Sequence, residues 1–355
     1  MERFFEKYPL EDKVVAVGVS GGADSLALVY RLNEYGQKNG IKVVALTVDH
    51  QLREESSREA EYVAGLMKKE GIEHHVLVWD GDKPQTGIEE AARQARYDLI
   101  GQYCREHGIR ILAMGHHQQD QAETFLLRLQ RGSGVFGLSG ILPVSRRENL
   151  TVIRPQLEDT PQSLKAYLQQ KGIEWVEDPS NQNEDFFRVK IRRFLPVLEK
   201  ELSLSVARLA GTAAVLSRTR DYVETQTDKF IRNNVRFWEN AGVSLSEKAF
   251  DGQHEEIRFQ VISRLIKKIG GKIYTPEADE VLRLCKNVKG GFSGCTLGGC
   301  EVFAFRGKIW IVPELKLKEK ISRQKWEEFT EKHSQYKKMA LPYKLRLSLM
   351  MSKPI

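Results

Sequence analysis

Cysteine is scarce in this chain of 355 residues. The four cysteines are Cys104, Cys285, Cys295 and Cys300, and none of them forms a C-x-x-C pair. So few thiols without pairing predict a reducing compartment rather than a disulfide framework. Three of them fall late in the chain, where two interpretations stay open: ordinary thiols, or three ligands of a zinc site that lacks a fourth ligand at the usual spacing.

Long apolar runs are also missing. No stretch approaches the roughly 20 apolar residues that a membrane-spanning helix needs, and the mean hydropathy is -0.43. The first residues, MERFFEKYPLEDK, are charged and do not resemble a signal peptide. We therefore expect a soluble, cytoplasmic protein that has no membrane partner.

Acidic residues are outnumbered by basic ones. The chain has 48 Asp and Glu against 55 Lys and Arg, so its net charge is +7 and its pI is about 9.0. This excess favours a polyanionic partner. The length of 355 residues predicts two or three domains.

The Walker signature G-x-x-x-x-G-K-[ST] is absent, but residues 14–25, VVAVGVSGGADS, form another phosphate-binding pattern. An apolar run leads into a Gly-Gly turn and then a helical segment, so that backbone N–H groups converge on an anion. The carboxylate of Asp24 would repel phosphate, and its position suits a ligand of a bridging Mg²⁺. The alternative is an ordinary Ser/Gly turn without a ligand. We assign nucleotide contacts to Ser20, Gly21, Gly22, Ala23, Asp24 and Ser25.

Apolar runs alternate with helical patterns in the first half of the chain. Such alternation predicts an α/β fold with a doubly wound, mostly parallel sheet. Ligands of these sheets bind outside the carboxyl ends of the strands. The predicted strands are residues 14–19, 41–48, 75–79, 111–114 and 151–153.

The pattern changes after residue 200. Residues 198–269 show helical periodicity without intervening strands, and residues 290–312 suggest a small hairpin. The polar, basic segment after Pro313 is typical of a linker or a surface helix. We therefore predict a nucleotide-binding α/β domain at 1–200, a smaller, mostly helical domain with a small hairpin at 201–313, and a basic tail or partial C-terminal segment at 314–355.

Polar residues follow two further predicted strands. Asp49 and His50 come after the second strand, where they border the nucleotide or where Asp49 caps a helix; neither alternative is preferred. Gly115 and His116 follow the fourth strand and are expected at the same edge of the sheet. Metal binding by His116 and His117 is the less favoured interpretation, because adjacent side chains point to different sides.

Two acidic residues lie on the next predicted helix. Asp120 and Glu123 are three residues apart, so their carboxylates share one face. They either form a solvated helix start, where the dipole favours acidic groups, or bind a cationic group. The spacing alone does not decide between these alternatives.

A basic series surrounds the junction with the second domain. It is either a solvated face or a contact surface for the triphosphate and an RNA backbone. Phe186, Phe187 and Phe194 interleave with it and either stack on an unpaired base or pack at the junction. The series comprises Arg128, Arg131, Arg188, Lys190, Arg192 and Arg193.

Taken together, five segments resemble one family. They are SGGADS at 20–25, VDHQLR at 48–53, EEAARQARY at 89–97, GHHQQDQAETFLLRLQRGSG at 115–134 and DPSNQNEDFFRVKIRRFLP at 178–196. In this order they are similar to the tRNA(Ile)-lysidine synthetases of the PP-loop ATP-pyrophosphatase superfamily. The similarity is strong over residues 13–200 and fainter over 201–313.

The resemblance implies an ATP- and Mg²⁺-dependent ligase that joins L-lysine to the wobble cytidine of a tRNA(Ile) with a CAU anticodon. It also implies that residues 1–200 are the ATP-binding catalytic domain and that residues 201–313 are a tRNA-binding domain. Asp24 is then the Mg²⁺ ligand, and Asp120 and Glu123 bind the lysine. A homodimer stays open. The implied catalytic residues are Asp24, Asp120, Glu123 and Arg192, and the implied tRNA contacts are Arg131, Arg188, Lys190, Arg192 and Arg193.

Two other functions compete with this hypothesis. A PP-loop tRNA sulfurtransferase also adenylates its substrate, but it generally needs a cysteine pair or an iron–sulfur cluster, and Cys104 stands alone in the α/β part. A non-catalytic RNA-binding protein with a retained nucleotide fold is the other rival. The intact set Ser20, Asp24, Asp120 and Glu123 counts against it.

Overall fold

The computed structural model describes residues 1–52, 55–81, 83–84, 86–177, 187–271, 276–288, 292–314, 323–336 and 339–351. The chain divides into two compact units, Met1–Thr219 and Arg220–Ile355, and helix α9 (Val206–Asn234) contributes residues to both. None of the described helices combines the length and the apolar composition required to cross a membrane.

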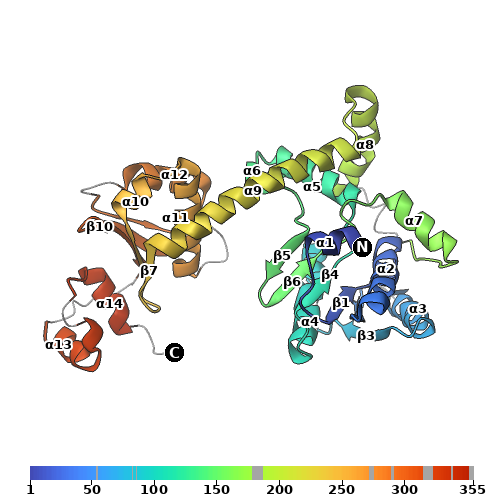
Figure 1. Ribbon diagram of the computed structural model, residues 1–355, viewed down its shortest axis with the longest axis horizontal. Helices are drawn as coiled ribbons and strands as arrows, with labels where there is room; N and C mark the ends of the chain where they lie inside the picture. The colour runs from blue at the N-terminus through green and yellow to red at the C-terminus, as the bar shows by residue number, and fades with distance from the viewer. Residues whose placement is uncertain are drawn as a thin grey trace. The chain divides into compact units, whose positions relative to one another are not determined.

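A six-stranded sheet forms the centre of the first unit (Figure 1). Its strand order is β3-β2-β1-β4-β6-β5, and every neighbouring pair is parallel except the β5–β6 hairpin at one edge. This confirms the predicted α/β class. The strands are β1 (Val14–Gly18), β2 (Lys42–Asp49), β3 (Glu73–Val78), β4 (Ile111–Ala113), β5 (Val144–Arg147) and β6 (Leu150–Ile153).

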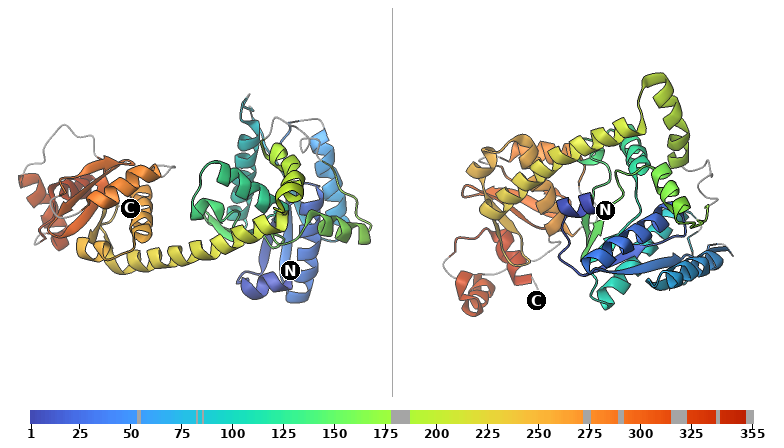
Figure 2. Two further views of the ribbon diagram at one scale, coloured as in Figure 1. Left: turned by 90° about the horizontal axis from the view of Figure 1, so that it is seen from above. Right: turned by 45° about the vertical axis from the view of Figure 1, so that its right-hand side comes forward.

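Helices cover both faces of this sheet (Figures 1 and 2). Val15 and Val17 of β1 pack into a core shared with α1 (Glu2–Lys7), α2 (Ala23–Asn39), α3 (Glu55–Lys69) and α7 (Pro161–Gln170). Ala16, which points to the opposite face, packs into a core shared with α4 (Ile88–Glu106). Successive residues of one strand thus serve the two layers of a doubly wound fold.

The five predicted strands all exist, with ends shifted by one or two residues. Strand β5 was not predicted, because its sequence VSRR has one apolar residue and no apolar run. It lies at the sheet edge and pairs with β6 alone. An antiparallel edge strand can leave one of its faces in solvent, so it does not require an apolar sequence on both faces.

A separate cluster joins three helices of the first unit. Helix α8 (Phe187–Leu202) packs against α5 (Gln118–Gln130) and against the beginning of α9. The short helix α6 (Val135–Leu138) follows α5. The buried residues of this cluster are Ala122, Phe125, Ile191, Leu195, Leu209 and Ala213. This packing places one face of α8 over the first turns of α5.

The second unit contains a five-stranded antiparallel sheet in the order β7-β8-β11-β10-β9. The predicted hairpin corresponds to β10 (Cys300–Phe305) and β11 (Lys308–Pro313), and β9 (Cys295–Leu297) extends it. The prediction that residues 198–269 contain no strands is wrong. Strands β7 (Val235–Phe237) and β8 (Val243–Ser246) interrupt the helices there, but they are short and carry polar residues.

Helices complete the second unit. Helix α10 (Glu247–Asp251) follows β8, and α11 (Glu255–Gly270) and α12 (Ala278–Asn287) pack in the same core. Burial raises the pKa of Cys285 to about 11, and Cys300 is also buried. In the described part of the chain, no three His, Cys, Asp or Glu side chains are grouped to hold a metal ion. The three late cysteines are therefore not assembled as a zinc site.

The tail after Pro313 is more than a linker. Its described part forms α13 (Arg323–Lys332), a 3₁₀ turn (Ser334–Tyr336) and α14 (Tyr343–Met351). Tyr336, Leu345 and Leu349 are buried against Trp238 and Trp310 of the sheet region. The apolar residues of the tail are dispersed among many charges, and this is why the composition suggested a surface segment.

Candidate nucleotide and amino-acid site

The loop between β1 and α2 has the geometry of an anion site. Gly21 adopts the left-handed φ of +81°, and a Cβ at this position would lie 3.3 Å from Val63, so a side chain would be strained. The hydroxyl of Ser25 accepts from the N–H of Ser20 at 3.0 Å and donates to the carbonyl of Gly22 at 3.0 Å. Ser25 therefore closes the turn and holds the first N–H groups of α2 at the carboxyl end of β1.

The connection from β4 to α5 lies directly against this loop. A Cβ on Gly115 would come within 3.1 Å of the backbone oxygen of Asp24, so only glycine fits without a shift. The strand order turns back between β1 and β4, and ligands of doubly wound sheets bind at such a point. The structure thus brings together two segments that the sequence predicted separately.

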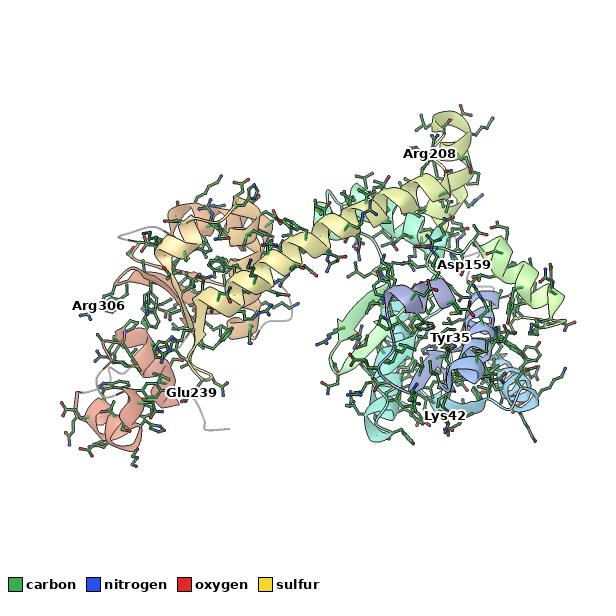
Figure 3. All side chains as sticks on the ribbon, viewed as in Figure 1. Tyr35, Lys42, Asp159, Arg208, Glu239 and Arg306 are labelled. Carbon is green, nitrogen blue, oxygen red and sulfur yellow. The ribbon has the colours of Figure 1, made fainter. Side chains whose placement is uncertain are left out.

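The start of α5 is fastened to α2 by one residue. The N–H of Gln118 donates to the carbonyl oxygen of Asp159 at 2.9 Å. The carboxylate of Asp159, which is labelled in Figure 3, pairs with Arg31 of α2 at 2.7 Å. Backbone and side chain of Asp159 therefore connect the first residue of α5 to the middle of α2.

Buried His117 links the two acidic side chains at these helix starts. Its Nε2 lies 3.4 Å from Asp24 Oδ2, and its Nδ1 lies 3.5 Å from Asp120 Oδ2. Asp120 and His117 also form a reciprocal capping box, because the N–H of each faces the side chain of the other at 3.3 and 3.0 Å. Burial lowers the pKa of His117, but the hydrogen bond to Asp24 and the neighbouring carboxylates outweigh burial, so its pKa is raised.

Glu123 is fully buried and already has a cationic partner. Arg192 of α8 donates to it through Nε at 2.8 Å and Nη2 at 3.4 Å, and Gln119 donates at 3.1 Å. Of the two alternatives that the sequence left open, the solvated helix start is wrong for Glu123, because its side chain is fully buried. Arg192, for which an RNA contact and a catalytic role stay predictions, lies against this carboxylate, and the hydrogen bond to Glu123 raises the pKa of Arg192.

The remaining basic residues divide into two kinds. Arg128 donates to the carbonyls of Gly137 and Gly140 at 2.7 and 2.9 Å, so it holds the loop after α5. Arg131, Arg188, Lys190 and Arg193 are exposed, although Arg188 also donates to Thr124 at 3.2 Å. Phe194 is 62% exposed. Phe186 lies outside the described residues, as does the side chain of Phe187.

Two polar residues lie at the end of β2: Asp49, whose carboxylate is hydrogen-bonded within the following turn, and His50, whose imidazole is neutral. Asp49 accepts from the N–H of Gln51 and from the hydroxyl of Ser57, both at 2.9 Å, so it fastens the turn into α3. Burial and the positive charge of Arg96, 3.4 Å away, lower the pKa of His50 to about 4. The Nδ1 atom of His50 is buried and has no hydrogen-bond partner among the described residues.

The imidazole of His116 is also buried and neutral. Burial and the charges of Arg154, Arg93 and Arg188 lower its pKa to about 3, and its buried Nδ1 also lacks a partner in the described chain. Unpaired buried ring nitrogens are costly unless a ligand satisfies them. The buried Nδ1 atoms of His50 and His116 therefore remain open to a hydrogen bond from a bound molecule, and their contact with the nucleotide stays a prediction.

Three residues of this region were missed by the sequence analysis. Arg96 lies in the segment EEAARQARY, which was quoted without a role for it. Arg154 and Gln156 are buried and directly follow β6. Arg154 donates to the carbonyl of Leu142 at 2.8 Å. The sequence analysis considered polar residues at the carboxyl ends of β2 and β4, because ligands bind there. The same reasoning applied to the end of β6 would have found Arg154 and Gln156.

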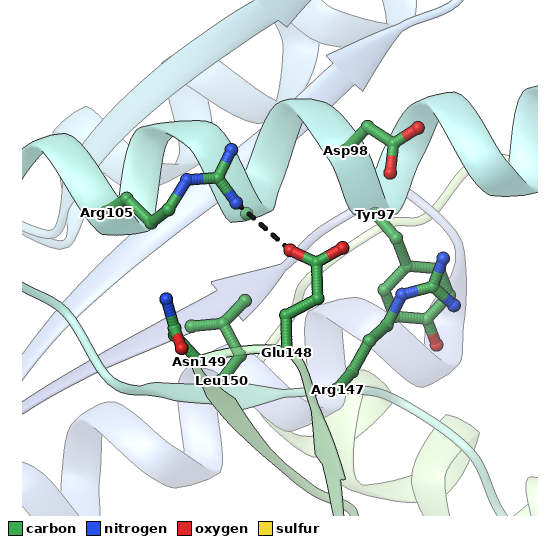
Figure 4. A pocket seen from close by; sticks show the side chains of 8 residues that line it. Tyr97, Asp98, Arg105, Arg147, Glu148, Asn149 and Leu150 are labelled. Carbon is green, nitrogen blue, oxygen red and sulfur yellow. Dashed lines mark hydrogen bonds and ion pairs between the residues drawn. The ribbon is translucent and has the colours of Figure 1, made fainter. Parts of the chain in front are cut away.

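A different pocket lies between α4 and the β5–β6 hairpin (Figure 4). Its charged side chains are already satisfied: Arg105 pairs with Glu148 at 3.3 Å, and Arg147 lies over the ring of Tyr97 at 4.2 Å. Arg147 also donates to Gln94 at 2.7 Å. Asp98 accepts from Gln94 at 2.7 Å, so within the described residues each charged side chain of this pocket already has a partner.

Sequence comparison agrees with the site at the end of β1. Residues 1–198 match the PP-loop domain family. A tRNA(Ile)-lysidine synthase from Hyphomonas neptunium is 36% identical over 313 residues, which cover 86% of this chain and 83% of that protein. One from Bradyrhizobium sp. strain BTAi1 is 34% identical over 308 residues, covering 83% of this chain and 86% of that protein.

Comparison of structures supports the fold alone. A tRNA thiolase from Methanococcus maripaludis shares a TM-score of 0.50 over 61% of this chain and 77% of its own, at 19% sequence identity. The family match covers more than half of the chain, and the curated relatives cover most of it. With the PP-loop geometry described above, these findings show that the chain belongs to the tRNA(Ile)-lysidine synthase family.

Proposed function

We propose that this protein is a tRNA(Ile)-lysidine synthetase. It uses ATP to ligate L-lysine to the wobble cytidine of the CAU anticodon, through an adenylated tRNA, and releases AMP and pyrophosphate. The modified tRNA then decodes AUA instead of AUG. The observation that carries the proposal is the adjacency of the β1–α2 anion loop and the Asp24–His117–Asp120 cluster.

The nucleotide is assigned to the loop that contains Ser20, Gly21, Gly22, Ala23 and Ser25. Mg²⁺ is assigned to Asp24, whose side chain is 42% exposed beside that loop. Mg²⁺ is commonly held by one or two carboxylates, with substrate phosphates and water as its other ligands, so a single carboxylate here fits the ion. Bound there, the metal would neutralise charge on the phosphates.

In the first step, the carbon-2 oxygen of cytidine attacks the α-phosphate and pyrophosphate leaves. The role of the protein is to position the reactants and to stabilise negative charge. The N–H groups at the start of α2 and the neutral imidazoles of His50 and His116 suit this role, since each has a donor or an unpaired nitrogen to offer. We assign the same role to Arg96, which lies next to His50.

In the second step, the ε-amine of lysine attacks carbon-2 and AMP leaves. The amine has a reference pKa of about 10.4, so it must lose a proton before it attacks. We assign the lysine contact to Asp120 and Glu123. Asp120 is the better base of the two, because Glu123 is fully buried and paired with Arg192.

The anticodon arm is assigned to the exposed residues Arg131, Arg188, Lys190 and Arg193. Arg192 is also assigned to this contact and to catalysis; its pairing with Glu123 leaves its side chain 37% exposed. A sulfurtransferase fits less well. Cys104 is fully buried and its pKa is raised to about 11, so it offers no thiolate to a substrate.

The test is a direct modification assay. The protein is incubated with ATP, Mg²⁺, lysine and tRNA bearing CAU, and the digested wobble nucleoside is weighed. We expect a mass gain equal to lysine minus water, with AMP and pyrophosphate in equal amounts. An unmodified cytidine, or a mass gain of sulfur, would exclude the proposal.

A further inference from the structure

A buried glutamine in the turn after β6 contacts the helix that follows the anion loop. Gln156 is completely buried and lies in the turn at residues 155–158. The backbone carbonyl of Gln156 accepts from the N–H of Asp159 at 2.9 Å, so the turn is closed by its own backbone. The side-chain amide of Gln156 is therefore not needed to close the turn, and none of the steps assigned above uses it.

The amide of Gln156 bridges two backbone groups of α2. Its nitrogen donates to the carbonyl oxygen of Asp24 at 3.1 Å, and its oxygen accepts from the N–H of Leu28 at 3.3 Å. In an α-helix two groups four residues apart are partners of each other, so the amide contacts both ends of one helical hydrogen bond. A side chain that inserts at this place bends a helix. Gln156 therefore acts on the geometry of the first turns of α2.

A second contact from the same part of the chain holds α2 farther along. Asp159 pairs with Arg31 at 2.7 Å. Asp24, Leu28 and Arg31 are spaced by four and three residues, so they lie on one face of α2. Two polar contacts along one face fix the rotation of a helix about its axis. This rotation sets the direction of the Asp24 side chain.

The backbone of Asp24 is enclosed, whereas its carboxylate is accessible. A Cβ on Gly115 would lie 3.1 Å from the carbonyl oxygen of Asp24 and 3.2 Å from its carbonyl carbon, so the β4–α5 connection touches the same peptide group as Gln156 does. The side chain of Asp24 is 42% exposed. A fixed peptide group with an accessible carboxylate is the arrangement that a pre-oriented cation ligand requires.

We propose that Gln156 is a positioning residue of the metal–nucleotide site, an inference that rests on the assignment of Mg²⁺ and ATP in the proposed function. Its amide holds the first turns of α2 so that the carboxylate of Asp24 faces the phosphates. Without the amide, the carbonyl of Asp24 and the N–H of Leu28 still have each other as partners. The loss of Gln156 thus changes the shape of the helix start more than it changes stability.

The test measures the affinity for ATP by calorimetry, once with Mg²⁺ and once with EDTA. Gln156→Met keeps the length of the side chain and removes the amide. Gln121→Met is the matched control, because Gln121 is also buried and its amide also bridges two backbone groups, the carbonyl and the N–H of Ile141, at 2.8 and 2.5 Å. Thermal midpoints compare the stability of both variants.

We expect Gln156→Met to raise the Kd of ATP in Mg²⁺ about tenfold, since removal of a partner that orients a metal ligand typically costs about 10- to 100-fold in affinity. The Kd in EDTA stays at the wild-type value. Gln121→Met keeps the wild-type Kd in both conditions, although its thermal midpoint falls. A merely structural role of Gln156 would weaken ATP equally in both conditions or would lower the midpoint alone.

A measurement on the wild type keeps the inference testable if Gln156→Met does not fold. The side-chain amide protons of Gln156 should exchange slowly with solvent in NMR spectra, and those of Gln169, exposed on α7, should exchange fast. Equally fast exchange of both would overturn the inference. So would an unchanged Kd with Mg²⁺ in Gln156→Met, an equal loss with EDTA, or the same loss in Gln121→Met.

The modification assay separates this inference from the proposed function. Lysidine formation by Gln156→Met with the Mg²⁺ dependence of the wild type rejects the positioning role and keeps the function. A loss of ATP affinity that appears only with Mg²⁺ in Gln156→Met, together with no lysidine from the wild type, rejects the function and keeps the positioning role.

Discussion

Glu123 Oε1 accepts a hydrogen bond of 2.8 Å from Nε of Arg192, across 69 residues of sequence. The carboxylate is completely buried, whereas the guanidinium is 37% exposed. A buried carboxylate is costly unless a cation and further donors accompany it. Arg192 therefore holds α8 on α5 at the place where the amino-acid substrate is proposed to bind.

Arg192→Gln should destabilise the first unit, because it leaves the charge of Glu123 buried without a cation. We expect the free energy of unfolding to fall by about 2 kcal/mol. This is less than the loss expected when a fully buried ion pair is broken, because Arg192 is partly exposed. Urea denaturation measures this loss. The double variant Arg192→Gln with Glu123→Gln should recover part of it, since no uncompensated charge remains. Additive losses would show that the two side chains are not coupled.

Asp24→Ala should abolish AMP formation while the fold is kept. The side chain is 42% exposed, so its removal empties no core site. Loss of a group that acts on transition-state charge costs about 10²-fold or more in turnover. Pyrophosphate release at saturating Mg²⁺ measures the effect, and Asp98→Ala, an exposed carboxylate on α4, is the control. Near-normal turnover would remove Asp24 from the metal site.

The phosphate loop could be predicted because its determinants are local. A Gly-Gly turn between an apolar run and a helix requires φ above zero at Gly21, and the structure has it there. The pairing of Glu123 with Arg192 could not be predicted in this way. Periodicity places residues on a helix face, but it does not say which other helix covers that face.

Two further features also depend on partners that the local sequence pattern does not reveal. His117 caps α5 together with Asp120, and this was missed because histidine is an unusual N-cap residue. Strand β8 was missed because it has four residues, VSLS, and its serines interrupt the apolar pattern. Ser244 is nevertheless buried, since its hydroxyl accepts from the indole of Trp238 at 2.9 Å. That partner lies outside the strand.

His50 should make the protein less stable in mild acid. Its pKa in the folded state is about 4, below the ordinary value near 6.5, so between these values the unfolded chain binds more protons. The contribution of His50 is present above pH 6.5 and is lost as the pH falls toward 4. NMR titration of the ring measures this pKa. Arg96→Gln should raise it, and Arg105→Gln, also on α4 but paired with Glu148, should not. Titration of wild-type His50 near pH 6.5 would contradict the prediction.

The exposed basic residues Arg131 and Lys190 should contribute salt-dependent RNA affinity rather than stability. Each side chain that neutralises a phosphate releases counterions and so adds a salt-dependent contribution to the affinity. The double change to Gln should therefore reduce the slope of log affinity against log salt by about one to two units. The thermal midpoint should hardly move, because exposed charges contribute little to stability. Lys38 and Lys69, exposed on α2 and α3, provide a control pair with the same change in net charge. An equal reduction of the slope in the control pair would mean that the RNA responds to overall charge, and Arg131 and Lys190 would then have no special place in the anticodon contact.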